Sequence, residues 1–136
     1  MRVIHRVVEP ARLGRYEILR PLARGGMAEL FLARATGIQG FEKRGVLKRI
    51  LPEMARDKEY VQMFLEEARL AAGLHHSNIV QVYDIGEDEA APFFAMEYLD
   101  GEDVRALCRA AQLSGERVPV EHALAIAIGV AAGLHH

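Results

Sequence analysis

The chain has 136 residues, of which 51% are hydrophobic and 26% are charged. These proportions are ordinary for a globular domain and argue against a disordered tail. A net charge of -2 gives no strong electrostatic field, so we expect neither nucleic acid nor an anionic membrane surface as a partner.

The cysteine content and the hydropathy of the sequence indicate the cellular compartment. The lone Cys108 excludes an internal disulfide and is compatible with a reducing environment. No stretch approaches the roughly 18 consecutive apolar residues of a membrane span. Residues 1–14, which we interpret as a leader, lack the apolar core of a signal peptide. We therefore expect a cytoplasmic location and no membrane segment in this sequence.

The first predicted element is a β-hairpin. Apolar and polar residues alternate over residues 16–22 and again over residues 28–32, and the pair Gly25-Gly26 lies between these runs. A third strand, residues 44–50, ends before a proline, which lacks the N–H that a strand ladder needs. The sequence thus begins with three consecutive antiparallel strands.

A helix and two further strands follow. Asp57 is the predicted N-cap of a helix that ends at Gly73, because apolar residues recur between them at helical spacing. Residues 79–85 and 92–98 are strand-like, and residues 86–89 are typical of a turn. The predicted fold class is α+β, with a five-stranded antiparallel sheet and one packed helix.

The C-terminal part is predicted to form two helices, residues 103–112 and 120–136. The second helix carries no polar side chain between Ala123 and Leu134, and such a helix has to be buried on all sides. Either it packs under the sheet of this domain, or its partner is further polypeptide. We favour the second alternative, which leaves helix 120–136 in need of a hydrophobic partner.

The glycine pair has a structural and a functional interpretation. Without a Cβ, the backbone of a glycine turn can bring its N–H groups close to phosphate oxygens, yet hairpin turns contain glycine for conformational reasons alone. The sequence lacks Gly-Lys-Ser/Thr, and Gly25-Gly26 precedes a strand instead of a helix. A Walker loop and a dinucleotide-binding fold are therefore both excluded.

Two charged residues give the glycine pair more weight. Lys48 has apolar neighbours in the third strand and needs a partner, and Glu67 lies near the apolar face of the helix. Taken singly, Lys48 could extend its ammonium to solvent and Glu67 could be a solvated helix charge like Glu66. In this order, however, a glycine-containing loop, a strand lysine and a helix glutamate match the signature of protein kinases.

Residues 16–136 resemble the start of a bacterial serine/threonine protein kinase of the eukaryotic type. Residues 22–30 resemble its glycine-rich loop, with Ala23 and Ala28 where glycines usually stand. Residues 64–69 resemble its helix, and residues 96–101 resemble its gatekeeper and hinge. The resemblance implies a small lobe over residues 15–101 and the first helices of an incomplete large lobe over residues 102–136.

The resemblance also implies ATP as the bound cofactor. Lys48 would pair with the α and β phosphates while Glu67 holds it, and these two residues are the implied catalytic set. The loop would cover the phosphates, apolar residues would roof the adenine, the hinge backbone would bond its edge, and an aspartate would face the ribose. The implied ATP-binding residues are Leu22, Ala23, Arg24, Gly25, Gly26, Met27, Ala28, Leu30, Val46, Lys48, Met96, Glu97, Leu99 and Asp103.

The catalytic-loop aspartate and asparagine of the family and its Asp-Phe-Gly motif are not in this sequence. Asp84-Ile85-Gly86 imitates that motif but precedes the hinge, so we interpret it as a turn. We therefore predict no metal ligand here, and expect magnesium and a protein substrate only for the complete domain. The 136-residue chain is expected to be inactive alone. The alternative is a non-catalytic, pseudokinase-like module that binds a nucleotide or a protein.

Overall fold

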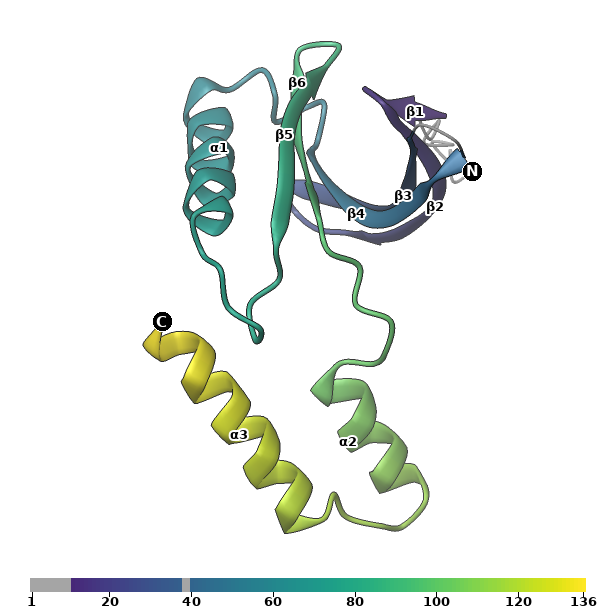
Figure 1. Cartoon of the computed structure of the whole chain (residues 1–136), viewed down its shortest axis with the longest axis vertical. Coiled ribbons are helices and arrows are strands. Elements are labelled where there is room, and N and C mark those ends of the chain that lie inside the picture. The colour runs from purple at the N-terminus through teal and green to yellow at the C-terminus, as the bar shows by residue number, and fades with distance from the viewer. Residues whose placement is uncertain (1–10, 38–39) are drawn as a thin grey trace, which may run out of the picture. The chain divides into compact units, whose positions relative to one another are not determined.

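The computed structural model describes residues 11–37 and 40–136 (Figure 1). These residues form two compact units. The first takes in the described residues up to Gly73 together with Gln81–Tyr98, and the second comprises Leu74–Val80 and Leu99–His136. The boundary between the units therefore falls three residues before the predicted end of the small lobe at residue 101, and residues 74–80 group with the C-terminal helices.

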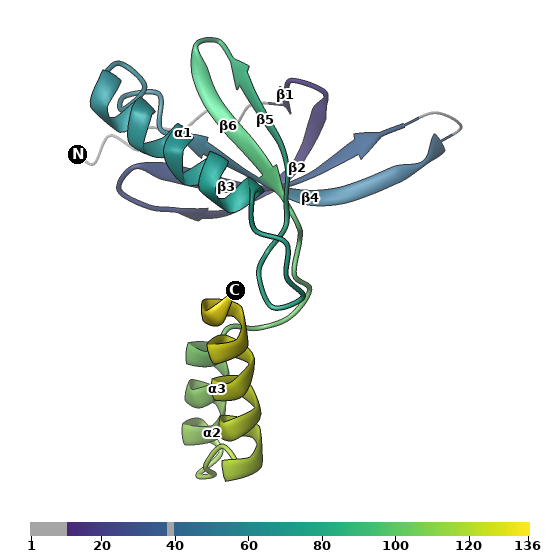
Figure 2. The same cartoon turned by 60° about the vertical axis from the view of Figure 1, so that its left-hand side comes forward.

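The first unit is built on a six-stranded antiparallel sheet with the strand order β1-β2-β3-β4-β6-β5. Helix α1 (Lys58–Ala72) lies beside the strands β5 and β6, and the sheet curls strongly (Figures 1 and 2). The strands are β1 (Arg12–Leu13), β2 (Tyr16–Arg24), β3 (Ala28–Thr36), β4 (Glu42–Ile50), β5 (Val82–Asp88) and β6 (Ala91–Met96).

The five predicted strands are present, and β1 adds a sixth that the sequence did not predict. Arg12 and Leu13 pair with Glu17 and Tyr16 at the start of β2. Leu13 is only 1% exposed, so burial of its side chain in the core fixes this short strand. Residues 12–13 thus belong to the sheet and not to a leader, while residues 1–10 of the predicted leader lie outside the described residues.

The hairpin between β5 and β6 differs from its prediction. Residues 86–88 continue β5, and the turn is made by Glu89 and Ala90 with φ values of 47° and 62°. A Cβ on Gly86 would lie 2.7 Å from Cζ of Phe93 on the paired strand. Glycine is therefore required at this position because a side chain would clash with the ring on the paired strand. In the sequence, such a glycine cannot be distinguished from a glycine in a turn.

Two hydrophobic clusters lie on the two faces of the sheet. The cluster on the α1 face includes Phe64 and Ala68 of α1, and the Phe64 ring packs against Phe94 of β6 at a centroid distance of 5.2 Å. As predicted, Asp57 caps α1, accepting a hydrogen bond from the Glu59 N–H at 2.9 Å. The other cluster consists of Leu13, Tyr16, Phe31, Ala33, Leu47, Phe93 and Ala95.

Asp84, part of the segment that imitates Asp-Phe-Gly, has a structural role in β5. The Tyr16 hydroxyl donates to its carboxylate at 3.1 Å, and the Arg15 guanidinium lies 3.2 Å from the same oxygen. Burial raises the pKa of Tyr16, so its hydroxyl stays protonated and remains a donor. These contacts connect the start of β2 to β5.

The second unit contains the helices α2 (Val104–Leu113) and α3 (Val120–His135). The Asn78 side-chain amide donates to the Gly129 carbonyl at 2.9 Å and so connects residues 74–80 to α3. No residue of α3 is buried, and Leu124, Ile128 and Leu134 are 56%, 67% and 83% exposed. Within residues 11–37 and 40–136, no helix has the length and apolar character needed to cross a membrane.

Candidate functional site

The glycine-rich segment forms the closed end of the β2–β3 hairpin. The Gly25 N–H donates to the Ala28 carbonyl at 2.8 Å and closes the loop, while the Leu51 N–H donates to the Met27 carbonyl at 2.9 Å. No atom beyond its chain neighbours lies within 4 Å of where a Cβ on Gly26 would be. The loop is thus held at both ends, and its tip has an open surface on which backbone groups can meet a ligand.

Lys48 and Glu67 come together beneath this loop. Lys48 lies in β4 opposite Leu30 of β3 and Phe94 of β6. Its Nζ is 2.5 Å from Oε1 of Glu67, and the two side chains are 25% and 55% exposed. The packing of Phe64 on Phe94 brings the helix and the strand together at this point, because Phe64 is one helical turn before Glu67 and Phe94 is the strand partner of Lys48.

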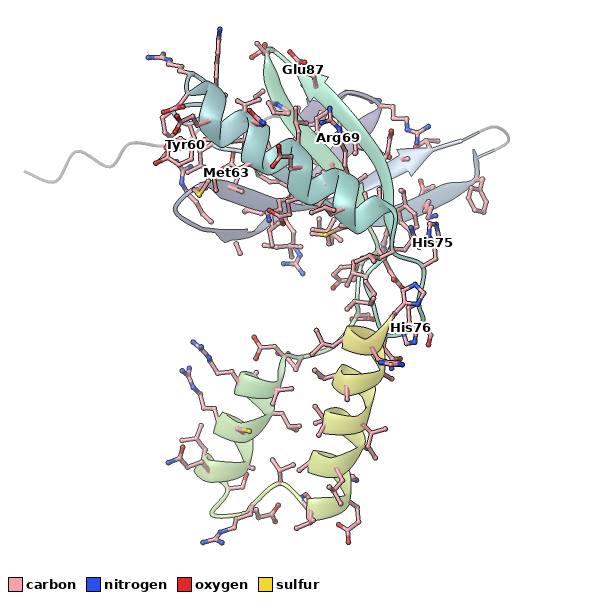
Figure 3. All side chains as sticks on the ribbon, turned by 90° about the vertical axis from the view of Figure 1, so that its left-hand side faces the viewer. Tyr60, Met63, Arg69, His75, His76 and Glu87 are labelled. Atoms are coloured by element: carbon pink, nitrogen blue, oxygen red, sulfur yellow. The ribbon has the colours of Figure 1, made fainter. Side chains whose placement is uncertain are left out.

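A pocket of about 810 Å³ lies between the loop, β4 and α1. Its size is within the range of ordinary small-molecule sites, about 300–1,000 Å³. Its lining includes residues that were not predicted for the site, among them Met63, which extends from α1 (Figure 3). The lining residues are Ala23, Arg24, Gly25, Gly26, Met27, Ala28, Leu30, Lys48, Ile50, Met63, Phe64 and Glu67.

Four other predicted residues of the first unit do not line this pocket. Leu22 is half-buried in β2, and Val46 faces Met96 across the β4–β6 ladder. The Glu97 N–H donates to the Gln81 carbonyl at 2.8 Å, and its carboxylate accepts from the Gln81 N–H at 3.3 Å. Val46 thus lies in the middle of β4, beside Met96 at the end of β6. Glu97 follows directly after β6, and Gln81 fixes this predicted hinge residue.

The last two predicted residues belong to the second unit. Leu99 is 60% exposed. The Asp103 carboxylate accepts a hydrogen bond from the Ala106 N–H at 2.7 Å and so caps α2. This aspartate therefore has a structural role as the N-cap of α2, one residue before the helix begins.

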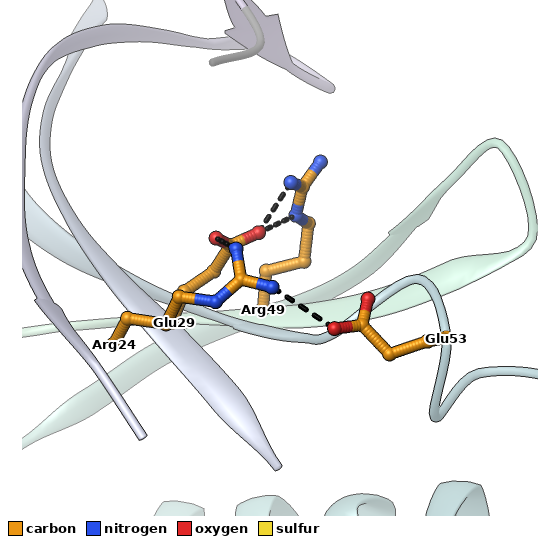
Figure 4. Close-up of polar contacts among 4 residues, drawn as sticks. All are labelled: Arg24, Glu29, Arg49 and Glu53. Atoms are coloured by element: carbon orange, nitrogen blue, oxygen red, sulfur yellow. Dashed lines mark hydrogen bonds and ion pairs between the residues drawn. The ribbon is translucent and has the colours of Figure 1, made fainter. Parts of the chain in front are cut away.

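A charged network behind the loop was missed by the sequence analysis. Glu29 pairs with Arg49 and with Arg24, and Arg24 also pairs with Glu53 (Figure 4). Opposite charges at facing positions of paired strands predict an ion pair, but the facing positions are known only once the strand register is known.

The chemistry of the pocket fits a nucleotide polyphosphate. A lysine ammonium and a glycine-containing loop provide donors for phosphate oxygens, and apolar side chains provide a surface for a base. Within the part of the chain that the structure describes, no group of three or more His, Cys, Asp or Glu side chains could hold a metal ion.

Comparisons with known proteins agree with this geometry. The family described as protein tyrosine and serine/threonine kinase matches residues 16–136. The tyrosine-protein kinase MasK of Myxococcus xanthus is 46% identical over 122 residues, which are 90% of this chain and 19% of MasK. The serine/threonine-protein kinase PrkC of Bacillus subtilis is 38% identical over 88 residues, 65% of this chain and 13% of PrkC.

Solved structures give the same result. The crystal structure of the Mycobacterium tuberculosis PknI kinase domain is 33% identical with a TM-score of 0.69, covering 90% of this chain and 48% of that domain. The chain therefore belongs to the protein tyrosine and serine/threonine kinase family, and residues 16–136 are part of a kinase domain of the bacterial, eukaryotic-type group. It spans less than a fifth of the length of MasK and of PrkC.

Proposed function

We propose that residues 16–136 form the ATP-binding portion of a protein kinase domain. The observation that carries this proposal is the pairing of Lys48 with Glu67 at 2.5 Å on one wall of the pocket whose other wall is the glycine-rich loop. A lysine held by a carboxylate keeps its ammonium at a fixed point, and a fixed positive charge suits phosphate better than a mobile one.

The residues of the pocket have distinct roles in this proposal. The backbone N–H groups of Gly26 and Met27 cover the phosphates, and Lys48 binds their oxygens. Glu67 touches no phosphate and acts by positioning Lys48. Leu30 contacts the base. Leu22, Val46 and Met96 do not line the pocket itself, and we assign them to the adenine side of the site, with Glu97 at the adenine edge.

In the complete kinase domain, the bound ATP with its magnesium supplies the γ-phosphate that is transferred to a protein hydroxyl. We propose serine and threonine as the acceptors, as in the name of PrkC, although MasK is named for tyrosine. Because the sequence contains neither the catalytic-loop nor the metal-binding aspartate, we propose that the 136 residues alone bind ATP weakly and transfer no phosphate.

A calorimetric titration with Mg-ATP tests the proposed site. We expect the wild-type chain to bind ATP. The Lys48→Met variant should bind it at least tenfold more weakly, which corresponds to about 1.4 kcal/mol. Lys43→Met is the matched control: Lys43 lies on the same strand, but its ammonium lies over the Tyr83 ring. Equal affinities for the wild-type chain and Lys48→Met would contradict the proposed site.

A further inference from the structure

Glu29 is the one buried polar or charged residue among the residues that the structure describes. The Arg49 guanidinium binds a single oxygen of its carboxylate through Nε at 2.9 Å and through a terminal nitrogen. The other oxygen accepts from Arg24 at 3.4 Å, and a second nitrogen of Arg24 donates to Glu53 at 2.9 Å (Figure 4). These residues, Arg24, Glu29, Arg49 and Glu53, form what we term the loop-stem network.

The network lies directly behind the glycine-rich loop. Arg24 and Glu29 face each other where β2 ends and β3 begins, so they flank the loop residues 25–28. Glu29 also faces Arg49 in the β3–β4 register. Side chains alternate between the faces of a sheet, so Glu29 and Arg49 lie on the face opposite to that of Lys48.

Stability alone does not account for this arrangement. Glu29 and Arg49 are 6% and 12% exposed, and replacing a buried ion pair with apolar residues of similar volume is often neutral or stabilising. The network instead fixes the position of the residues at the base of the loop. Arg24 has a carboxylate of β3 on one side and Glu53, in the connection between β4 and α1, on the other. Its guanidinium therefore holds the stem of the loop to the segment that leads into α1.

We propose that Glu29 is a positioning residue for the nucleotide site. Through Arg49 it is fixed to the sheet, and through Arg24 and Glu53 it holds the glycine-rich loop at a set distance from Lys48 and from α1. The network thus determines how firmly the loop closes over phosphates. Arg24 is its one member that lines the pocket, so Glu29, Arg49 and Glu53 act on the loop from outside the pocket. This inference deepens the proposed ATP site and rests on it.

Amide hydrogen exchange in the nucleotide-free chain tests the network. The Gly25 and Leu51 N–H groups report loop closure, because they donate to Ala28 and Met27 of the loop. In Arg24→Ala we expect these amides to exchange roughly two- to fivefold faster, the change that corresponds to losing a partly exposed ion pair. The matched control is Arg34→Ala. In the wild-type chain, Arg34 pairs with two carboxylates on the same sheet but away from the loop.

A second variant separates positioning from stability. Glu29→Met combined with Arg49→Met replaces the buried pair with flexible apolar side chains, so we expect a Tm equal to or above that of the wild-type chain. Loop closure should nevertheless weaken, because Arg24 loses one of its two carboxylates. Arg24→Ala carries the test by itself if the double variant does not fold.

The outcomes distinguish this inference from the proposed function. Faster exchange at Gly25 and Leu51 in both variants, with Arg34→Ala like the wild-type chain, supports the network. Exchange at wild-type rates in Arg24→Ala overturns it. If exchange changes as expected but the wild-type chain binds no Mg-ATP, the network stands and the proposed function fails. If the wild-type chain binds Mg-ATP, Arg24→Ala should bind it about two- to fivefold more weakly, and unchanged affinity would also overturn the positioning role.

Discussion

Replacing Glu67 by glutamine separates the two effects of its ion pair with Lys48. Glutamine keeps the length and the helix propensity of the side chain but removes its charge. Because the Lys48 and Glu67 side chains are 25% and 55% exposed, solvent screens their attraction, and the pair should stabilise the fold by no more than about 1 kcal/mol. For a domain of this size we expect the Tm to fall by roughly 5 °C or less.

The effect on nucleotide binding should be larger than the effect on stability. Without the carboxylate, the Lys48 ammonium is no longer held at one point. Losing the preorganised charged hydrogen bond should cost about 1.5 kcal/mol, or roughly tenfold in Mg-ATP affinity. Calorimetric titration measures the affinity, and a thermal melt of the same sample measures the Tm.

Glu66→Gln is the matched control for this variant. Glu66 is the preceding residue on α1, is exposed, and accepts a hydrogen bond from Gln62 instead of from Lys48. We expect it to bind Mg-ATP as the wild-type chain does. Equal affinities for the Glu67→Gln and Glu66→Gln variants would refute the reasoning that Glu67 positions Lys48.

Three further predictions concern the frame of the site. Phe64→Ala removes a buried ring that packs on Phe94, and we expect it to lower the free energy of unfolding by about 3–5 kcal/mol in urea titrations; a loss below about 1 kcal/mol would show that this ring does not hold α1. Gly86→Ala puts a Cβ 2.7 Å from the Phe93 ring and should cost about 1–3 kcal/mol, whereas Gly26→Ala has open space and should leave the Tm nearly unchanged; similar Tm values for these two variants would contradict the packing role of Gly86. Burial raises the pKa of Tyr16, so the folded state holds the phenolic proton more strongly than the unfolded state does. The resulting stability is complete below the unfolded pKa of about 10 and is lost as the pH rises through the folded pKa. Melts between about pH 8 and pH 11 should therefore show a shallower loss of Tm in Tyr16→Phe than in the wild-type chain, and parallel curves would rule out this contribution.

The elements of the site could be predicted because they depend on local patterns. The glycine pair between two alternating runs, the lysine in the next strand and the glutamate on an amphipathic helix are all visible in the sequence. Asp57 gives the start of α1 because aspartate has a strong preference for the N-cap, and Gly73 marks its end. Bringing Lys48 and Glu67 together requires only that this helix pack its apolar face on the sheet beside this strand, where Phe64 contacts Phe94 of β6.

What could not be predicted depends on contacts between distant segments. The strand β1 has two residues, too few for any periodicity, and exists because the Leu13 side chain is buried. Gly86 looks like a turn residue, but the Phe93 ring accounts for it. Glu29 and Arg49 are separated by 20 residues, and only the β3–β4 register shows that they pair.

Chemical modification of the lysines tests the central claim most directly. The lysines of the chain are Lys43, Lys48 and Lys58. Acetylation rates for each, followed by mass spectrometry, can be compared with and without millimolar Mg-ATP. If the loop, Lys48 and Glu67 form one phosphate site, ATP should slow the modification of Lys48 and leave Lys43 and Lys58 unchanged. The account would be contradicted if ATP bound to the chain or protected another lysine but left the acetylation rate of Lys48 unchanged.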